Sequence, residues 1–215
     1  MSNTRSRLLK TLIACLASGI AAGLLTAGSC QRSGADCRIA AIQVLSPDPP
    51  PWIIWLNWIN WLPGVIFGVL FALTALDPGK PDRVRRVAAY ALASGLAYLM
   101  AGLAFALLLL PASGKEFDLI LWVWPAGLAA GLVGASVLAL MSNKLFQPPD
   151  SAAGAFAGTW LPAIVGAVLG VLFVWICVYG EQQILIAWPI AFSLWQIGVG
   201  LALMRLTPTR HASTD

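Results

Sequence analysis

The side chains best suited to binding a ligand lie in one stretch in the first third of the chain. Four tryptophans recur there at three-residue intervals with two asparagines between them: Trp52, Trp55, Trp58, Trp61, Asn57 and Asn60. Indole rings and amides together could hold a small solute, with apolar walls and a few polar contacts. The same rings could instead form an aromatic belt that fixes helix depth at a membrane surface. A spacing of three favours neither reading, because on an α-helix it spreads the rings over half the circumference.

The predicted ligand site faces outward and includes residues from later in the chain. In the topology derived below, eight of the ten tryptophans fall near the outer interface, while Trp160 lies near the inner one and Trp195 at mid-depth. Gln196 adds an amide within the last apolar segment. The candidate ligand-binding residues are Trp55, Asn57, Trp58, Asn60, Trp61, Trp122, Trp188 and Gln196.

Residues for catalysis are scarce. The single histidine, His211, lies in the C-terminal tail, so a Ser-His or Cys-His nucleophile within the membrane cannot be built. The sequence has no His/Cys cluster with metal-ligand spacing, and the Gly79-Lys80 pair lacks the rest of a phosphate-binding loop. We therefore expect no enzyme, no cofactor and no metal site.

Two cysteines predict a covalent feature outside the membrane. Cys30 and Cys37 lie in one loop and could form a disulfide in an oxidising compartment, with Cys177 as a third candidate. The segment that ends at Cys30 also resembles a bacterial lipobox, although Ala27 stands where that motif favours leucine. Acylation of Cys30 would exclude its disulfide, so the two hypotheses compete.

Composition sets the protein class. Of 215 residues, 59% are hydrophobic and only 10% charged, against about 25% charged in a typical soluble domain. The mean hydropathy is +0.82. We predict a polytopic membrane protein that forms one domain over residues 1–215. The net charge of +4 does not indicate nucleic-acid binding, because the basic residues are spread over short loops and tails.

Apolar segments predict an all-α bundle of six transmembrane helices. They cover residues 11–29, 53–76, 87–110, 119–141, 160–179 and 184–204. Each is close to the twenty residues or so that a spanning helix needs. The first could be a signal peptide instead of a helix. In the second, the uncharged run after Trp61 covers only about 22 Å of helix, so the tryptophan stretch must complete the span or lie beside it.

Basic residues predict the orientation. With a cytoplasmic N-terminus, ten of the thirteen lysines and arginines lie inside and three outside. This positive-inside bias places both termini in the cytoplasm. Short loops and this bias are typical of a bacterial inner, or plasma, membrane protein. The inside residues are Arg5, Arg7, Lys10, Lys80, Arg83, Arg85, Arg86, Lys144, Arg205 and Arg210.

Glycine pairs predict close helix packing. Four pairs are spaced four residues apart within apolar segments: Gly19 and Gly23, Gly64 and Gly68, Gly127 and Gly131, Gly166 and Gly170. Such pairs let helix backbones approach, either within the chain or against a partner helix. Most of the polar residues in the spans should hydrogen-bond between helices: Asn57, Asn60, Tyr90, Ser94, Tyr98, Ser193 and Gln196.

A short internal similarity suggests a 3+3 inverted repeat. WLPGVIFGVLFAL at 61–73 and WLPAIVGAVLGVL at 160–172 share six identities in thirteen positions. They lie in the second and fifth segments, which run in opposite directions, as in many transporters. Proline in a first helical turn and tryptophan at an interface could also produce the match by accident.

Three function classes remain for a chain with no Asp, Glu, Lys, Arg or His inside its apolar segments, of which a redox or lipid-processing enzyme is the least favoured. That absence disfavours ion coupling. The first class is a small transport or solute-binding membrane component, and in size and helix number the chain is similar to substrate-binding components of vitamin importers, without a shared motif. The second is a non-catalytic scaffold or assembly factor that binds partner helices, or a second copy, through glycine-rich faces. The expected partners are the lipid bilayer, a small-molecule ligand or another membrane protein, and no nucleic acid.

Overall fold

The computed structural model describes residues 2–33, 58–76, 79, 81–109, 116–146, 158–179 and 183–205. Within these ranges the chain is helical apart from short turns, and it contains no strand. Alanine and leucine favour helices, and in a bilayer a helix satisfies its backbone donors and acceptors internally. The described helices are α1 (Ser2–Ser33), α4 (Trp58–Ala75), α5 (Arg83–Leu109), α6 (Glu116–Phe146), α8 (Trp160–Tyr179) and α9 (Ile184–Met204).

Five of these helices are long and apolar enough to cross a membrane. The bounds of α8 and α9 are those predicted, whereas α1, α5 and α6 extend beyond their apolar segments. A helix that leaves the hydrocarbon keeps its backbone hydrogen bonds, so apolar length alone does not mark its ends. The exception is α4, whose apolar part, Trp61–Ala75, is shorter than a span. Residues 53–57 of the predicted second segment lie outside the described residues, so the sixth span stays a prediction.

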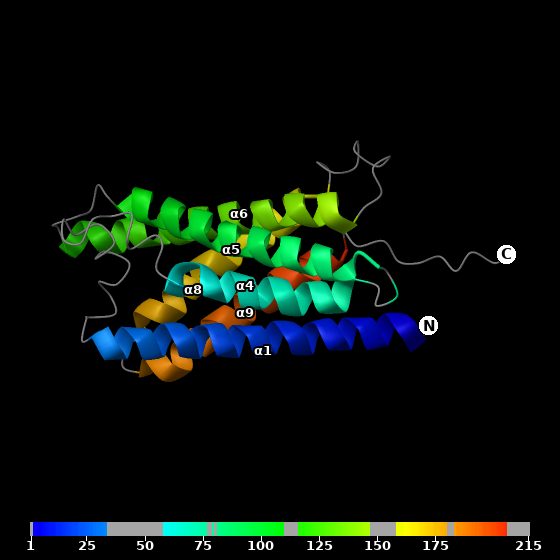
Figure 1. Cartoon of the computed structure of the whole chain (residues 1–215). Helices are drawn as coiled ribbons and strands as arrows, with labels where there is room; N and C mark the ends of the chain where they lie inside the picture. The colour runs from blue at the N-terminus through cyan, green and yellow to red at the C-terminus, as the bar shows by residue number, and fades with distance from the viewer. Residues whose placement is uncertain are drawn as a thin grey trace.

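The helices form a ring in chain order, and the last helix closes it against the first. Each helix packs against its neighbours in sequence, and α9 packs along both α8 and α1 (Figure 1). Successive helices run in opposite directions, so α1 begins and α9 ends at the same end of the bundle. We call this the basic end, and we call the other the tryptophan end, near Trp61, Trp122 and Trp188.

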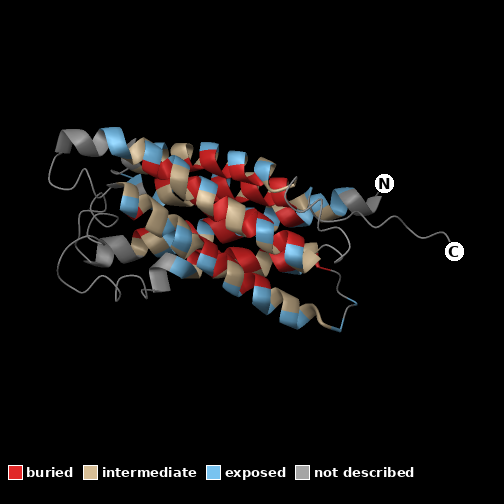
Figure 2. Cartoon of the chain, turned by 90° about the horizontal axis from the view of Figure 1, so that it is seen from above, coloured by how far each residue is buried: buried red, intermediate tan, exposed pale blue. Residues whose placement is uncertain are grey.

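Buried residues line the inside of this ring and exposed ones its outside (Figure 2). One continuous core joins all but one of the described helices, from Cys15 in α1 through Phe71, Tyr90 and Leu138 to Val199 in α9. Large apolar side chains such as Val168 on α8 remain exposed on the outer surface. An apolar exterior around a packed interior is the pattern of a bundle solvated by lipid.

Glycine pairs hold the neighbouring helices together, as their spacing predicts. A Cβ atom on Gly131 would collide with the Gly166 carbonyl, and one on Gly170 with the Gly127 carbonyl, so α6 and α8 touch backbone to backbone. The other two pairs make equally close contacts, Gly19 and Gly23 against α9, and Gly64 and Gly68 against α5. All four pairs therefore pack against helices of this chain and not against a partner helix.

Arginines close the helix ends at the basic end. Arg7 donates to the Ala75 carbonyl at 2.9 Å and Arg83 to the Leu73 carbonyl at 3.0 Å, both in the last turn of α4. The last carbonyls of a helix lack intrahelical donors and carry partial negative charge, so a guanidinium stabilises them. These basic residues therefore also cap helices, beyond any role in orientation.

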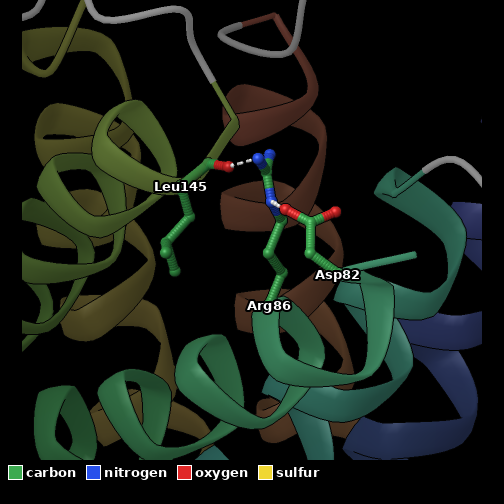
Figure 3. A network of polar contacts seen from close by, with 3 residues as sticks. All are labelled: Asp82, Arg86 and Leu145. Atoms are coloured by element: carbon green, nitrogen blue, oxygen red, sulfur yellow. Dashed lines mark hydrogen bonds and ion pairs between the residues drawn. The ribbon is translucent and has the colours of Figure 1, made fainter. Parts of the chain in front are cut away.

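Arg86 makes the same kind of contact to α6. Its Nη1 donates to the Leu145 carbonyl at 3.0 Å, and its Nε pairs with the Asp82 carboxylate at 2.6 Å (Figure 3). The ion pair is partly exposed, so its own contribution to stability is at most about 1 kcal/mol. Its effect is to hold the guanidinium where it joins the start of α5 to the end of α6.

Candidate functional site

A fully buried amide lies inside the ring near mid-depth. Gln196 on α9 accepts a hydrogen bond from Ser18 on α1 through Oε1, and its Nε2 donates to the Tyr98 hydroxyl on α5 at 2.9 Å. Ser18 also lies 3.0 Å from the Cys15 carbonyl. Side chains of three helices thus meet at one amide: α1 packs closely along α9, whereas α5 and α9 do not pack closely against each other.

Aromatic rings lie beside the tyrosine that bonds to this amide. Tyr98 contacts Trp195 edge-on at 5.4 Å between centroids, and it lies parallel to Phe192 at 6.4 Å. Phe192 in turn contacts Phe173 at 4.9 Å and Trp188 at 6.4 Å. These distances fall within the range in which aromatic pairs attract each other. The Gln196 cluster, as we name it, comprises the hydrogen-bonded residues and the surrounding rings: Ser18, Tyr98, Gln196, Phe173, Trp188, Phe192 and Trp195.

A second aromatic cluster fills the interior near the basic end. Phe71 lies 5.6 Å from both Phe67 and Tyr90, and Tyr90 lies 5.0 Å from Phe146. The Tyr90 hydroxyl makes a buried hydrogen bond of 3.0 Å with Ser142. We call these five residues the Tyr90 cluster.

The two clusters differ in exposure. In the Tyr90 cluster, Phe67, Phe71, Tyr90 and Ser142 are buried and Phe146 is partly exposed. In the Gln196 cluster, Tyr98 and Trp188 are both partly exposed, as is Phe173. Trp188 lies in the second turn of α9, close to the tryptophan end. Three of the seven residues of the Gln196 cluster are therefore partly exposed, against one of five in the Tyr90 cluster.

Only two of the predicted ligand-binding residues belong to the Gln196 cluster. They are Gln196 itself and Trp188. Trp61 and Trp122 are 37% and 38% exposed, on α4 and α6, and no ring contact joins them among the described residues. Their exposure fits the aromatic-belt reading better than a shared pocket.

The remaining predicted positions fall in the tryptophan stretch. Trp58 and Asn60 lie in the first turn of α4, but their side chains are outside the described part, and Trp55 and Asn57 are outside it altogether. Their role in a ligand site stays a prediction.

Hydrogen bonds between helices are confirmed for three of the predicted polar residues: Tyr90, Tyr98 and Gln196. The buried hydroxyls of Ser94 and Ser193 have no hydrogen-bond partner among the described residues. A Cβ atom on Gly68 would meet Ser94, and one on Gly19 would meet Ser193, so both serines face closely packed backbone.

Sequence reasoning missed several residues of the cluster. Phe192 and Ser18 are among them, although a signal for the first was present. Trp188, Phe192, Trp195, Gln196 and Val199 follow the spacing of one helix face, and that face of α9 lines the ring. Ser18 carried no such signal, because its partner lies 178 positions away.

Thiols and metal ligands add no second site to the described part of the chain. Cys15 is buried and Cys177 half-buried, and both are free thiols. Cys37 is outside the described residues and the Cys30 side chain is too, so their disulfide and the acylation of Cys30 stay predictions. Among the described residues, no group of three His, Cys, Asp or Glu side chains could hold a metal ion.

The helices define the class of protein. Long apolar helices with an apolar exterior make this chain a multi-span α-helical membrane protein. No family model, curated protein or solved structure matches it. Its role must therefore be argued from the geometry of its own interior.

Proposed function

We propose that this protein is a small transport or solute-binding component of a bacterial inner membrane, and that its ligand site is the Gln196 cluster. The observation that supports this most is the fully buried Gln196 amide, which lies inside the ring of helices and bonds to Tyr98, itself in contact with further aromatic rings. A glutamine in a lipid-solvated bundle often serves to hydrogen-bond across helices, and Gln196 in addition brings an N–H without an acceptor among the described residues. Polar groups among aromatic walls are the usual composition of a small-molecule site.

The difference in burial supports access from one side. The Tyr90 cluster fills the basic end, while Trp188 and Phe173 lie partly exposed toward the other end. If the basic end faces the cytoplasm, as the charge bias predicts, the site opens outward. A green fluorescent protein fused to the C-terminus tests that orientation, since it fluoresces only on the cytoplasmic side. A dark fusion at normal expression would reverse the direction of access.

The scaffold alternative was based on glycine-rich helix faces that would bind a partner helix. Each of the four glycine pairs lies against a neighbouring helix of this chain, so none is available to a partner helix. A scaffold would have to bind through the exposed apolar exterior. The solute-binding role is therefore the better supported of the two.

We also propose that α1, α4 and α5 form an inverted repeat with α6, α8 and α9. In the aligned segments of α4 and α8, Pro63 and Pro162 are both buried, while Trp61 and Trp160 are both exposed. The two helices run in opposite directions, as an inverted repeat requires. Exchange of 61–73 with 160–172 tests this: a true repeat yields some monodisperse protein, and an accidental match yields none.

A thermal-stability screen tests the ligand site. Purified protein is heated with vitamins, amino acids, nucleobases and lipids, and the wild type is compared with Gln196→Leu and Tyr90→Phe. A ligand that binds the cluster should raise the melting temperature of the wild type and Tyr90→Phe but not of Gln196→Leu, because bound ligand stabilises only the state that binds it.

A further variant separates the two predicted sites. Trp58→Ala, Asn60→Ala changes the tryptophan stretch and leaves the cluster untouched. A ligand lost in that variant but kept in Gln196→Leu would move the site to the membrane surface. If no ligand stabilises the wild type and a stoichiometric partner co-purifies instead, the scaffold is the correct function.

A further inference from the structure

The Gln196 cluster contains more hydrogen-bond donors than the bonds within it use. Gln196 brings two N–H groups, and Ser18 and Tyr98 bring one O–H each. The bonds in the structure use the Ser18 hydroxyl, shared between Gln196 Oε1 and the Cys15 carbonyl, and one amide N–H, which donates to Tyr98. The second amide N–H and the Tyr98 O–H have no acceptor among the described residues.

This surplus does not depend on which way the amide points. If the amide is turned around, Tyr98 donates to Gln196, one amide N–H donates to Ser18, and Ser18 donates to the Cys15 carbonyl. One amide hydrogen still has no acceptor. A buried donor without an acceptor costs about 1–3 kcal/mol, so a molecule that supplies an acceptor here gains that free energy.

The rings of the cluster favour a flat molecule. Tyr98 and Phe192 are parallel within 4°, with centroids 6.4 Å apart. A flat ring that stacks on an aromatic face lies about 3.5 Å from it. A planar molecule can therefore contact the face of either ring over its whole area.

Charge sets a third condition. No Asp, Glu, Lys, Arg or His lies within the apolar segments, and Arg7, Arg83 and Arg86 bond to carbonyls at the basic end. A charged ligand would be buried in the cluster without a counter-ion, which is costly in a medium of low dielectric. The ligand must therefore be neutral.

We propose that the Gln196 cluster binds a neutral, flat ring that carries a hydrogen-bond acceptor such as a carbonyl oxygen. The ring lies against Tyr98 and Phe192, and the acceptor takes the unused hydrogens of Gln196 and Tyr98. This inference rests on the proposed solute-binding function and specifies the chemistry of the solute.

Three bicyclic probes of similar size test the ligand class. Coumarin carries a carbonyl acceptor, naphthalene carries no polar group, and indole carries only a donor. Their binding to the purified full chain is measured by equilibrium dialysis against micelles of the same detergent without protein. We expect coumarin to bind about tenfold more tightly than naphthalene, since it gains one to two hydrogen bonds, and indole to bind no more tightly than naphthalene.

Variants separate recognition of the acceptor from the fold. Gln196→Leu should bind coumarin and naphthalene alike, and Tyr98→Phe, which keeps the ring, should lose part of the preference for coumarin. Tyr90→Phe removes a buried hydroxyl of the other cluster and should keep the full preference. Unchanged naphthalene binding in each variant shows that the cluster is still folded.

Other outcomes overturn the inference or the function beneath it. Equal binding of coumarin and naphthalene by the wild type, or tighter binding of indole, would exclude an acceptor-specific site. A ligand from the stability screen that depends on Gln196 but is charged or not flat would refute the ligand class and leave the solute-binding function standing. If neither the probes nor the screen give binding, both proposals fail, and Gln196 only joins helices.

Discussion

The two aromatic clusters consist of similar side chains but differ in burial and in hydrogen bonding. Each has a buried tyrosine hydroxyl bonded to a polar partner from another helix, Tyr90 to Ser142 and Tyr98 to Gln196. The Tyr90 and Ser142 hydroxyls bring two hydrogens and use one of them in the bond between them, whereas Gln196, Ser18 and Tyr98 bring four and leave at least one without an acceptor among the described residues. All of the Tyr90 cluster except Phe146 is buried, whereas Tyr98, Phe173 and Trp188 of the Gln196 cluster are partly exposed. One region is therefore suited to holding the ring shut and the other to receiving a molecule.

The largest expected effect on the free energy of unfolding comes from truncating a buried ring of the Tyr90 cluster. Phe71→Ala should lower the free energy of unfolding by about 3–5 kcal/mol, because Phe71 is fully buried and its loss leaves a cavity. Phe173→Ala, in the Gln196 cluster, should cost roughly half as much, because Phe173 is partly exposed. Reversible unfolding in mixed micelles measures both. Equal costs would mean that the two clusters are packed alike, and the contrast between them would fail.

Next in size are the hydrogen bonds themselves. Double-mutant cycles on Ser18→Ala with Gln196→Leu, and on Tyr90→Phe with Ser142→Ala, should each give a coupling of about 1 kcal/mol. The two bonds are expected to stabilise the fold similarly, although only one cluster binds ligand. A coupling near zero for Ser18 and Gln196 would show that the amide does not join these helices, and would weaken the case for a preformed site.

A smaller effect is expected from the cap at the basic end. Arg86→Ala removes the bonds to Leu145 and Asp82 and should cost about 0.5–1 kcal/mol, since the guanidinium is partly exposed. The cost should shrink as salt concentration rises, because exposed charges are screened. Arg85→Ala, at an exposed neighbour, is the matched control and should leave stability unchanged. A loss that is independent of salt would assign the effect to packing of the side-chain stem.

The smallest effect should follow changes in the exposed tryptophans. Trp61→Phe and Trp122→Phe keep an aromatic ring at the tryptophan end and should alter unfolding free energy and ligand affinity by less than about 0.5 kcal/mol. A large loss of ligand affinity in either variant, with stability unchanged, would place the ligand site at the membrane surface and exclude the Gln196 cluster as that site.

Local sequence patterns predict the bounds of a helix where polar or turn-forming residues flank its apolar segment. Residues 160–179 and 184–204 have polar or turn-forming flanks close to both ends, and α8 and α9 have those bounds. The beginnings of α1 and α5 were placed too late, at residues 11 and 87, because basic residues do not end a helix that has left the hydrocarbon. Glycine spacing predicted close packing, but not which helix each pair faces.

The site was less predictable, because it depends on which helices meet. Gln196 and Trp188 drew attention as polar and aromatic residues in an apolar segment, and both line the interior. The tryptophans at intervals of three attracted equal weight, yet Trp61 faces outward. Residue type alone does not distinguish an indole at a membrane surface from one inside a bundle. The hydrogen bond from Ser18 requires α1 and α9 to be neighbours, which no local pattern indicates.

Closure of the ring by α1 and α9 has a consequence for biosynthesis. Of the described helices, α1 is translated first and α9 last, so Ser18 must wait for Gln196 to be translated, 178 positions later. At 5–20 residues per second that delay is about 10–35 s. Until then the Gly19 and Gly23 face of α1 has no partner within the chain. Assembly of this membrane protein is therefore completed by a late step, and a stop codon before α9 leaves two helices, α1 and α8, each with one side unpacked.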